Sequence, residues 1–322
     1  MGLIKKPCEI EAKKTISMMV YGQPGMGKTT LALSAPGAVL FDYDGGVNRI
    51  NAAHQVPTLQ VTNWAETTEA LAEVAQEPSY KTIVIDTLGK MVGYIEKYIQ
   101  ENDLAENKGK RVWTYPNGAL TLKGFGERKN IFKQFLMSVA TSGKSVVFVA
   151  HEKEDRNGDE IIKRADAGSD GFAGDIFKDL DLVGYVYGIG NERHITFQTN
   201  NTHFCKKTGS MLNDYKLPVV VDEKGAAVGT NDFIAKTILT TYVADQTHSN
   251  ELHNCYNKLV EEIKGKAAEI ADADSANDFV EYVKGITHIY DSKVVAGELI
   301  KARAAELNLS YDKTAGKYVA GC

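Results

Sequence analysis

The sequence is short of several features that would each have indicated a class of protein. Its four cysteines, Cys8, Cys205, Cys255 and Cys322, are far apart and form no CxxC pair. That spacing argues against a zinc site or a disulfide framework and favours a reducing compartment. No run approaches about eighteen uncharged apolar residues, so we expect no transmembrane helix.

A strong charge bias and a targeting signal are also missing. The formal net charge is −5, which does not indicate a polyanionic partner, although a local basic surface can exist on an acidic chain. The opening residues, MGLIKKPCEIEAKK, lack the apolar core of a signal peptide. Lys6 stands where a myristoylation signal has Ser or Thr. We therefore expect a cytoplasmic protein with no membrane partner.

Short apolar runs alternate with helical patterns over most of the chain. The expected strands cover residues 15–21, 38–43, 58–62, 82–87, 145–151, 181–188 and 194–199. The expected helices cover residues 28–35, 64–77, 88–102, 124–141 and 231–243. Short, nearly all-apolar strands between helices predict an α/β fold with a mostly parallel sheet covered on both faces. The last strands are expected to form antiparallel hairpins.

The character of the sequence changes after about residue 245. Two later stretches have the periodicity of amphipathic helices. The polar segment 246–250, QTHSN, suits a linker. We therefore expect an α/β domain over residues 1–245 and a helical C-terminal region over residues 246–322.

The segment GQPGMGKT, residues 22–29, matches the phosphate-binding loop pattern G-x-x-x-x-G-K-[ST] at every fixed position. Gly25 and Gly27 let the backbone turn its N–H groups inward, and the start of the following helix favours an anion. Lys28 would reach the β- and γ-phosphates of ATP, and the Thr29 hydroxyl would ligate Mg²⁺. A glycine-rich turn without a ligand is the alternative. The residues expected to bind the nucleotide are Gly22, Gln23, Pro24, Gly25, Met26, Gly27, Lys28, Thr29 and Thr30.

Polar residues at three strand ends are expected to complete this P-loop site. TIVID is an apolar strand that ends in Asp86, which would hold the water shell of the metal as in a Walker B strand. FDYDGG places Asp44 at a strand end, where it would either orient a water molecule or serve only the turn. His151 follows SVVFVA and would sense the γ-phosphate, unless it is only a surface residue.

These motifs, in this order, resemble the core of RecA-like recombinases. In detail the chain resembles the compact phage-encoded RecA-like ATPases of single-strand annealing and recombination, over roughly residues 14–215. The resemblance implies a catalytic set of Lys28, Asp44, Asp86 and His151, with Asp44 in place of the family's usual Glu. It also implies ATP bound at a subunit interface of a homo-oligomeric ring or filament. Single-stranded DNA, and a single-strand-binding protein, would be partners.

RecA-like proteins also carry basic residues that reach the ATP of a neighbouring subunit. Lys206 and Lys207, which follow the HITFQT strand, lie at the corresponding place in this sequence. Arg193 could serve instead. A solvated pair of lysines in a loop is the alternative.

Two loops bind single-stranded DNA in RecA-like proteins, and both places hold long polar insertions here. The first, residues 106–129, has six Lys or Arg residues against two Glu, with aromatic residues between them. Such a loop can neutralise phosphates and stack on bases, or it can be a solvated surface lid. The second, residues 152–177, is also rich in acids and could contain a hairpin around residues 156–160. The candidate DNA-binding residues are Lys108, Lys110, Arg111, Trp113, Tyr115, Lys123, Phe125, Arg128, Lys163 and Arg164.

The sequence therefore predicts a RecA-like ATPase that binds ATP, Mg²⁺ and single-stranded DNA. Two other classes stay open. One is a nucleotide-binding switch or scaffold that does not bind DNA. The other is a P-loop phosphotransferase, which the absence of an arginine-rich lid segment disfavours.

Overall fold

The computed structural model describes residues 5, 10–157, 160–168, 170–210 and 212–321. The chain divides into two compact units. One spans Lys13–Val243, and the other combines Ala244–Cys322 with the N-terminal residues up to Ala12. The expected domain boundary at residue 245 lies close to this division.

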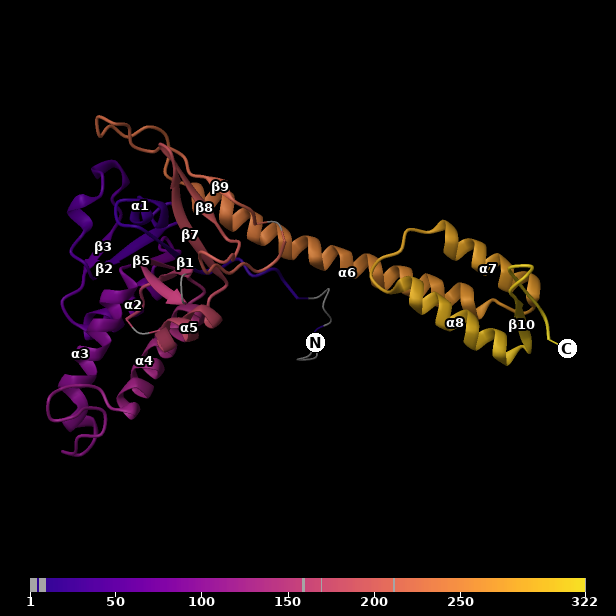
Figure 1. Ribbon diagram of the computed structural model, residues 1–322, viewed down its shortest axis with the longest axis horizontal. Coiled ribbons are helices and arrows are strands. Elements are labelled where there is room, and N and C mark those ends of the chain that lie inside the picture. Colours follow the sequence, from indigo (N-terminus) through magenta and orange to yellow (C-terminus); the bar gives the residue numbers. More distant parts are fainter. Residues whose placement is uncertain (1–4, 6–9, 158–159, 169, 211, 322) are drawn as a thin grey trace. The chain divides into compact units, whose positions relative to one another are not determined.

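The larger unit is built on one central sheet, which has nine strands in the described part of the chain (Figure 1). Its path runs β3-β2-β4-β5-β1-β7-β8-β9, and β6 pairs with β5 beside that path. The pairs from β3 through to β7 are parallel, whereas β5–β6, β7–β8 and β8–β9 are antiparallel. The prediction of a mostly parallel sheet with antiparallel hairpins is therefore confirmed. The strands are β1 (Ser17–Gly22), β2 (Ala38–Asp42), β3 (Thr58–Gln60), β4 (Thr82–Asp86), β5 (Ser145–Asn157), β6 (Glu160–Ala165), β7 (Leu182–Ile189), β8 (Glu192–Thr196) and β9 (Tyr215–Lys216).

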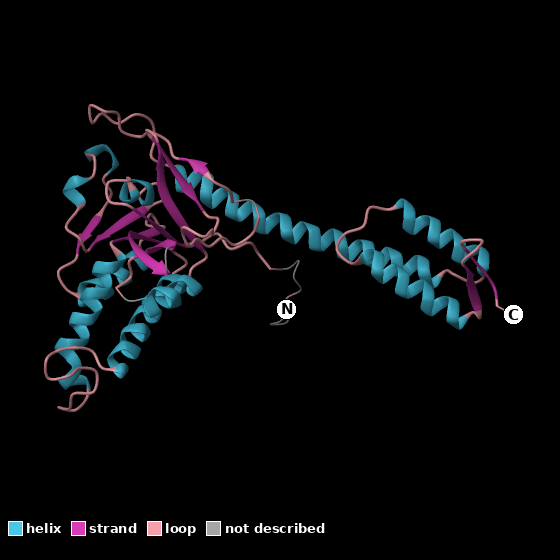
Figure 2. Cartoon of the chain, in the orientation of Figure 1, coloured by secondary structure: helices cyan, strands magenta, loops and turns pink. Residues whose placement is uncertain are grey.

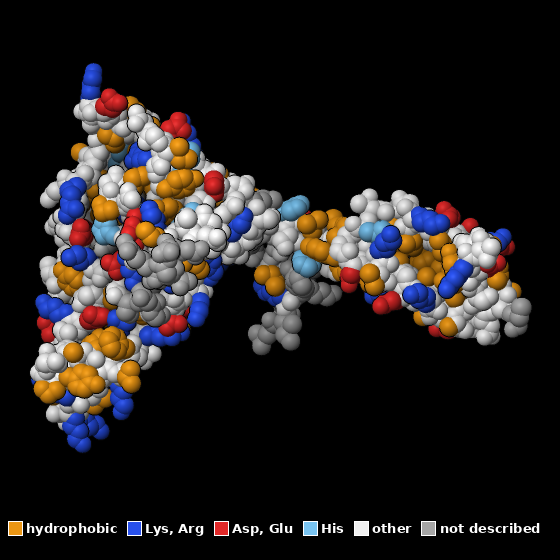
Figure 3. Space-filling view, in the orientation of Figure 1, with side chains coloured by type: hydrophobic (Ala, Val, Ile, Leu, Met, Phe, Trp, Pro, Cys, Tyr) orange, Lys and Arg blue, Asp and Glu red, His pale blue; other side chains and the backbone are white. Residues whose placement is uncertain are grey.

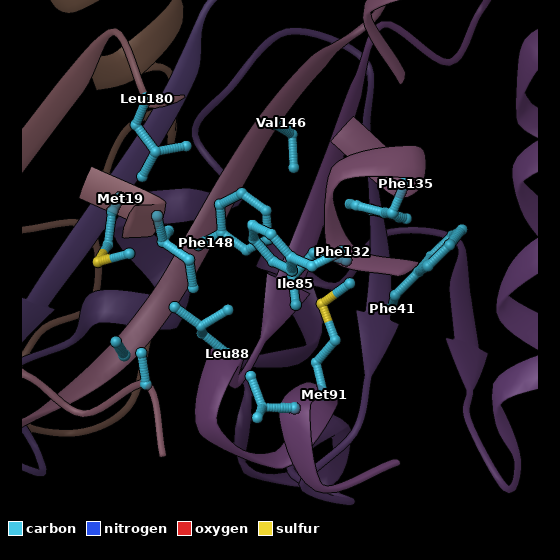
Figure 4. Packing of buried hydrophobic residues seen from close by; sticks show 14 of the residues in the cluster. Met19, Phe41, Ile85, Leu88, Met91, Phe132, Phe135, Val146, Phe148 and Leu180 are labelled. Atoms are coloured by element: carbon cyan, nitrogen blue, oxygen red, sulfur yellow. The ribbon is translucent and has the colours of Figure 1, made fainter. Parts of the chain in front are cut away.

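The central strands form because their side chains are apolar on both faces, as expected for a sheet that is covered on both sides. Every residue of β2 and β4 is buried. Along β1, Met19 and Tyr21 join one apolar cluster, while Met18 and Val20 join another on the opposite face. Figure 4 shows part of the first cluster, in which Met19, Ile85 and Phe148 lie among Phe132, Phe135 and Leu88.

Four helices lie on the face that carries Met19 and Tyr21 (Figure 1). The Asn63 side chain caps the first of them by accepting the Glu66 N–H, and the Thr121 hydroxyl caps the third by accepting the Gly124 N–H. The fourth was not expected from the sequence, because its glycines and acids resemble a loop. The four helices are α2 (Trp64–Gln76), α3 (Leu88–Glu106), α4 (Leu122–Thr141) and α5 (Asp170–Asp179).

The other face of the sheet is covered by α1 (Lys28–Ala32) and by a segment that begins with a π-helix, Ile234–Ile238. That segment continues without a break as α6 (Leu239–Ala268). The prediction of a linker over residues 246–250 is therefore wrong. The segment is polar but contains neither Gly nor Pro, so nothing in it ends a helix.

The smaller unit has its own apolar cluster, which includes Ile263, Phe279 and Ile300. Helix α7 (Ala273–Gly285) begins at a capping box, in which the side chains of Asp272 and Ser275 each accept a backbone N–H. Helix α8 (Ser292–Glu306) follows, and then a hairpin of β10 (Leu309–Asp312) and β11 (Lys317–Ala320) (Figure 2). The hairpin was not expected. In the described part of the chain, no helix is long and apolar enough to cross a membrane.

Candidate nucleotide-binding site

The P-loop connects the end of β1 to the start of α1. Gly25 and Gly27 have φ angles of 81° and 76°, in the left-handed region that glycine adopts most easily. An added Cβ at Gly27 would lie 2.3 Å from Nη1 of Arg193, so the end of that flexible side chain would have to shift. The positive φ angles are therefore what favours glycine at both positions, as the sequence motif indicates.

Lys28 is the first residue of α1 and is buried, with 5% of its surface exposed. Its Nζ donates to the carbonyl oxygens of Gly22 and Gln23, at 2.9 and 2.7 Å. Burial lowers the pKa of this ammonium, and the carboxylates of Asp86 and Glu152 oppose that effect. A phosphate group would supply the anion that this buried cation lacks within hydrogen-bonding distance.

Thr29 and Asp86 come together although they are far apart in the sequence. The Thr29 hydroxyl donates to Oδ2 of Asp86 at 2.7 Å. Burial raises the pKa of the Asp86 carboxyl, the Thr29 hydrogen bond lowers it, and the negative charges of Asp42 and Asp44 raise it further. A cation beside Asp86 would favour the ionised carboxylate, so the electrostatics of this position suit a metal ion.

The residues fit Mg²⁺ in particular. Among the described residues, no group of three or more His, Cys, Asp or Glu side chains forms a metal site. Mg²⁺ commonly takes only one or two protein oxygens, with waters and substrate phosphates completing its octahedron. Thr29 and Asp86 would hold the ion that accompanies a nucleotide, and the ion would neutralise charge on the phosphates.

The two acids of the FDYDGG segment have different roles. The Asp42 carboxylate accepts the N–H groups of Asp44, Gly46 and Val47 at 2.9–3.1 Å, so Asp42 forms the turn. Asp44 instead lines a cavity of about 290 Å³ that is also lined by Lys28 and several other P-loop residues. Asp44 therefore lies at the same cavity as the P-loop lysine.

His151 lies at the same edge of the sheet. It follows the buried part of β5 and is paired in register with Gly22 at the end of β1. The imidazole is exposed and lines the cavity together with Asp44, Asp86 and Lys28. Because β5 lies between β1 and β4, it separates the P-loop from Asp86, and it carries His151 level with Gly22, the last residue of β1.

The cavity also has lining residues that the sequence did not indicate. Arg49, Ile50 and Thr87 are among them, and Arg49 forms an ion pair with Asp44. Arg49 is the last residue of a 3-10 helix, Val47–Arg49, and belongs to no motif. Conversely, Met26 of the P-loop packs on the apolar cluster on the α1 side of the sheet.

The residues expected to act on a neighbouring subunit's ATP have partners in their own chain. The Lys206 ammonium donates to the carbonyl oxygens of Phe177, Lys178 and Leu180 at the end of α5. The Lys207 ammonium donates to the carbonyl of Leu212 at 3.0 Å. The expectation for Lys206 therefore needs correction, because in this structure its charge stabilises the end of a helix.

Arg193 is placed differently from those lysines. Its side chain lies beside Gly27 of its own P-loop, and β8 holds it there through the pairing of Arg193 with Gly188. The side chain is half-buried. A guanidinium so close to the P-loop of the same chain favours a supporting role in cis over a role in trans.

The first candidate DNA-binding loop is organised around Asp103 of α3, a fully buried carboxylate. Asp103 accepts the backbone N–H groups of Val112, Trp113 and Thr114 and the Thr114 hydroxyl. Beyond these bonds the chain turns back, with Thr114 bridged to Leu120. The segment is therefore a fixed hairpin between α3 and α4.

Several candidate DNA-binding side chains are exposed on this hairpin and its flanks. Tyr115 is 53% exposed and Phe125 is 44% exposed. Figure 3 shows Lys or Arg side chains gathered with hydrophobic ones at the end of the α3–α4 region. Trp113 differs, because it is half-buried and packs against the main apolar cluster. The exposed basic candidates are Lys108, Lys110, Arg111 and Lys123.

The expectation that Arg128 binds DNA is wrong for this structure. Arg128 is 4% exposed, forms an ion pair with Glu96 and lies 4.4 Å from the centre of the Phe172 ring. Lys163, in the second loop, is half-buried and lies 3.5 Å from a carboxylate oxygen of Glu152. That loop contains the hairpin that the sequence suggested, because β5 and β6 pair on either side of residues 158–159.

Replacing Asp103 by Asn should lower the stability of the protein. Burial alone would raise the pKa of Asp103, but hydrogen bonds from Thr114 and from backbone N–H groups outweigh burial and hold it well below its usual range. A depressed pKa contributes stability above the ordinary carboxyl pKa and loses it as pH falls through the folded-state pKa. We expect a loss on the order of 2–4 kcal/mol at pH 7, because hydrogen bonds to a buried charge are broken.

The pH dependence identifies the cause of that loss. In thermal unfolding, the difference between the wild type and the Asp103→Asn variant should shrink as the pH is lowered below about 4, where the unfolded carboxyl becomes protonated. Glu101→Gln, at an exposed position of the same helix, is the matched control. A difference that stays constant between pH 7 and pH 3 would contradict the role of the ionised carboxylate.

The fold and the site together define the class of protein. A loop with a buried lysine follows the first strand, a Thr–Asp pair lies beside it, and the intervening strand carries a polar residue level with the end of that first strand. These are the parts of a P-loop nucleotide-binding protein.

The family follows from the sequence comparison. Residues 14–208, more than half of the chain, match the AAA domain family, so the chain belongs to that family of P-loop ATPases. The matched segment contains β1–β8 and ends shortly after β8. Among curated proteins, no sequence matches the chain.

Proposed function

We propose that the protein is a DNA-stimulated ATPase that works on single-stranded DNA in recombination or annealing, as a homo-oligomer resembling the phage-encoded RecA-like ATPases. Its site would use ATP and Mg²⁺. The observation that carries the DNA part of the proposal is the exposed basic and aromatic surface on the α3–α4 hairpin, which a buried carboxylate holds in shape.

In this proposal each residue of the cavity has a distinct role. Lys28 would exchange its backbone carbonyl partners for the β- and γ-phosphates, and Thr29 with Asp86 would hold Mg²⁺, which would neutralise charge on the phosphates. Asp44 accepts a hydrogen bond from the attacking water and so orients it. His151, which lines the cavity, would sense whether the γ-phosphate is present.

The hairpin supplies both kinds of contact that a single strand needs. Lys108 and Lys110 are exposed and can neutralise phosphates. Tyr115 and Phe125 present rings on which bases can stack, an interaction that tolerates any sequence. The net charge of the whole protein is −5, so any affinity for DNA must come from such local surfaces.

A second basic and aromatic surface lies beside the β5–β6 hairpin. The rings of Phe177 and Phe204 stack there with centroids 5.0 Å apart. They line a cavity of about 550 Å³, and no acidic residue is among its described lining residues. The basic residues of that lining are Lys153, Arg164, Lys178 and Lys206. This cavity favours an anionic ligand with a flat apolar part, such as a nucleotide unit of a single strand.

Strand β5 offers a physical connection between the two sites. His151 lines the nucleotide cavity, and Lys153, two residues further along β5, lines the basic cavity. Lys153 is paired directly with Arg164 across the β5–β6 ladder. A shift of the β5 end on binding of the γ-phosphate would therefore move both cations together. Such a shift would make the affinity for DNA depend on the nucleotide state.

The proposal predicts that single-stranded DNA accelerates ATP turnover, and that a surface variant removes the effect. In the triple variant Lys108→Ala, Lys110→Ala, Tyr115→Ala we expect affinity for an oligodeoxythymidine to fall by about tenfold or more, because stacking on one base alone is worth ~1–3 kcal/mol. The salt dependence should also weaken, by about 0.7 in slope for each lost phosphate contact. Fluorescence anisotropy at several salt concentrations measures both quantities.

Two exposed lysines on α3, the helix that precedes the hairpin, provide the control. Lys90→Ala with Lys97→Ala removes equal charge from α3 and should leave the affinity for DNA unchanged. Wild-type turnover without stimulation by DNA would instead support a nucleotide-binding switch. Turnover only in the presence of a small acceptor would support a phosphotransferase.

A further inference from the structure

Two oppositely charged side chains face each other at one rim of the nucleotide cavity. Nη2 of Arg49 lies 3.4 Å from Oδ2 of Asp44 and 3.5 Å from the Asp44 carbonyl oxygen. Both residues line the cavity that Lys28, Thr29 and Asp86 also line. The turn that carries them is fixed, because Asp42 accepts three of its N–H groups.

The contact between Arg49 and Asp44 is easy to exchange. The Arg49 side chain is 72% exposed, and both of its distances to Asp44 are long for a charge-assisted hydrogen bond. An exposed ion pair of this kind contributes little stability. Arg128 differs from Arg49, because Arg128 is buried and forms a close ion pair with Glu96. Arg49 is therefore held at the cavity by its backbone position rather than by its partner.

A triphosphate in the cavity would change the balance of charge around Asp44. The terminal phosphate would bring negative charge next to a carboxylate, which is unfavourable unless a cation lies between them. A guanidinium can bind phosphate oxygens through two parallel N–H donors, an interaction stronger than its long contact with Asp44. The arginine also has room to turn, since most of its surface is exposed.

We propose that Arg49 contacts the terminal phosphate of the nucleoside triphosphate bound by its own chain, and that it leaves Asp44 to do so. This inference rests on the proposed function, because it needs a triphosphate in the cavity. The exchange leaves the Asp44 carboxylate able to accept a hydrogen bond from water. It would also make binding sensitive to the third phosphate, since in this proposal that phosphate alone contacts Arg49.

Discrimination between nucleotides tests the proposal. We expect Arg49→Ala to raise the dissociation constant of a non-hydrolysable ATP analogue by about tenfold or more. The dissociation constant of ADP should stay within twofold of the wild-type value, because only the triphosphate loses a charge-assisted contact. Arg49→Lys should recover part of the loss, since it keeps the charge but not the paired donors. Titration calorimetry with Mg²⁺ present measures each constant, and Lys97→Ala on α3 is the control for removal of a surface charge.

A mixing experiment tests whether Arg49 acts on its own chain. Arg49→Ala and Lys28→Ala protomers are mixed in equal amounts, and turnover is compared with that of each variant alone. If Arg49 acts in cis, no chain of the mixture has both groups in its own site, so no activity should return; recovery would place Arg49 on the neighbouring subunit. Equal losses for ADP and the ATP analogue, or no loss for either, would overturn the contact with the terminal phosphate.

The wild-type titration separates this inference from the function on which it rests. If the wild type does not bind the ATP analogue, the proposed function fails, and the role of Arg49 fails with it. If the wild type binds the analogue and Arg49→Ala binds it equally well, only the role of Arg49 is refuted. Circular dichroism of Arg49→Ala should be unchanged, because the side chain is exposed and its ion pair is weak.

Discussion

Replacement of Lys28 by Ala should abolish measurable ATP turnover. Lys28 is the one lysine of the P-loop motif, and its ammonium is expected to bind the phosphates. The side chain is already buried beside the P-loop, where its charge is only weakly screened by solvent. Loss of one such charge from a preorganised site commonly lowers kcat by about 10²–10³, and we expect at least that here. A coupled assay of ADP release at saturating ATP measures the effect.

The resting contacts of Lys28 make the design of this experiment important. Its Nζ satisfies the Gly22 and Gln23 carbonyls, so truncation could also disturb the P-loop backbone. Lys28→Met preserves the length and apolar part of the side chain and should lose turnover while unfolding at nearly the wild-type temperature. Wild-type turnover in either variant would refute the assignment of the P-loop.

Replacement of Asp44 by Asn should slow hydrolysis far more than it weakens binding. The carboxylate lines the cavity and is not part of the hydrogen bonds that form the turn, so its loss should leave the loop intact. Removal of a group that accepts a proton in the transition state lowers kcat by about 10²–10⁴. Single-turnover kinetics, with the affinity for the ATP analogue measured separately, resolve the two effects.

Asp42 provides the structural comparison for Asp44. Asp42→Ala removes the acceptor of three N–H groups in the turn and should therefore weaken nucleotide binding and stability together. If Asp44→Asn behaves in the same way as Asp42→Ala, then Asp44 also serves the turn, and the catalytic assignment is wrong.

The nucleotide site was largely predictable because its residues belong to local patterns. The P-loop is one continuous segment. Asp86 ends the apolar strand β4, and His151 follows the apolar part of β5, so the order of the strands in a parallel sheet brings both residues to one edge. Arg49 could not be found in this way. It lies in a short 3-10 helix beyond the end of β2, and no residue pattern shows that it lines the same cavity as the P-loop.

The surface charges were harder to predict for a different reason. In the sequence, Arg128 and Lys123 look alike, as basic residues in one polar segment. Only the packing of α4 shows that Arg128 is turned toward Glu96 and Phe172, whereas Lys123 is exposed. Lys206 is a similar case, because its carbonyl partners at the end of α5 depend on a helix that the sequence did not indicate.

The buried carboxylate of Asp103 also bears on how tightly the hairpin could hold a ligand. A flexible loop loses conformational entropy when a ligand orders it, and that loss opposes binding. Here the backbone from Val112 to Thr114 is ordered when the protein folds, so little of that loss remains for the moment of association. For the single strand that we propose as the ligand, the residence time should then depend mainly on the contacts made by the exposed lysines and rings.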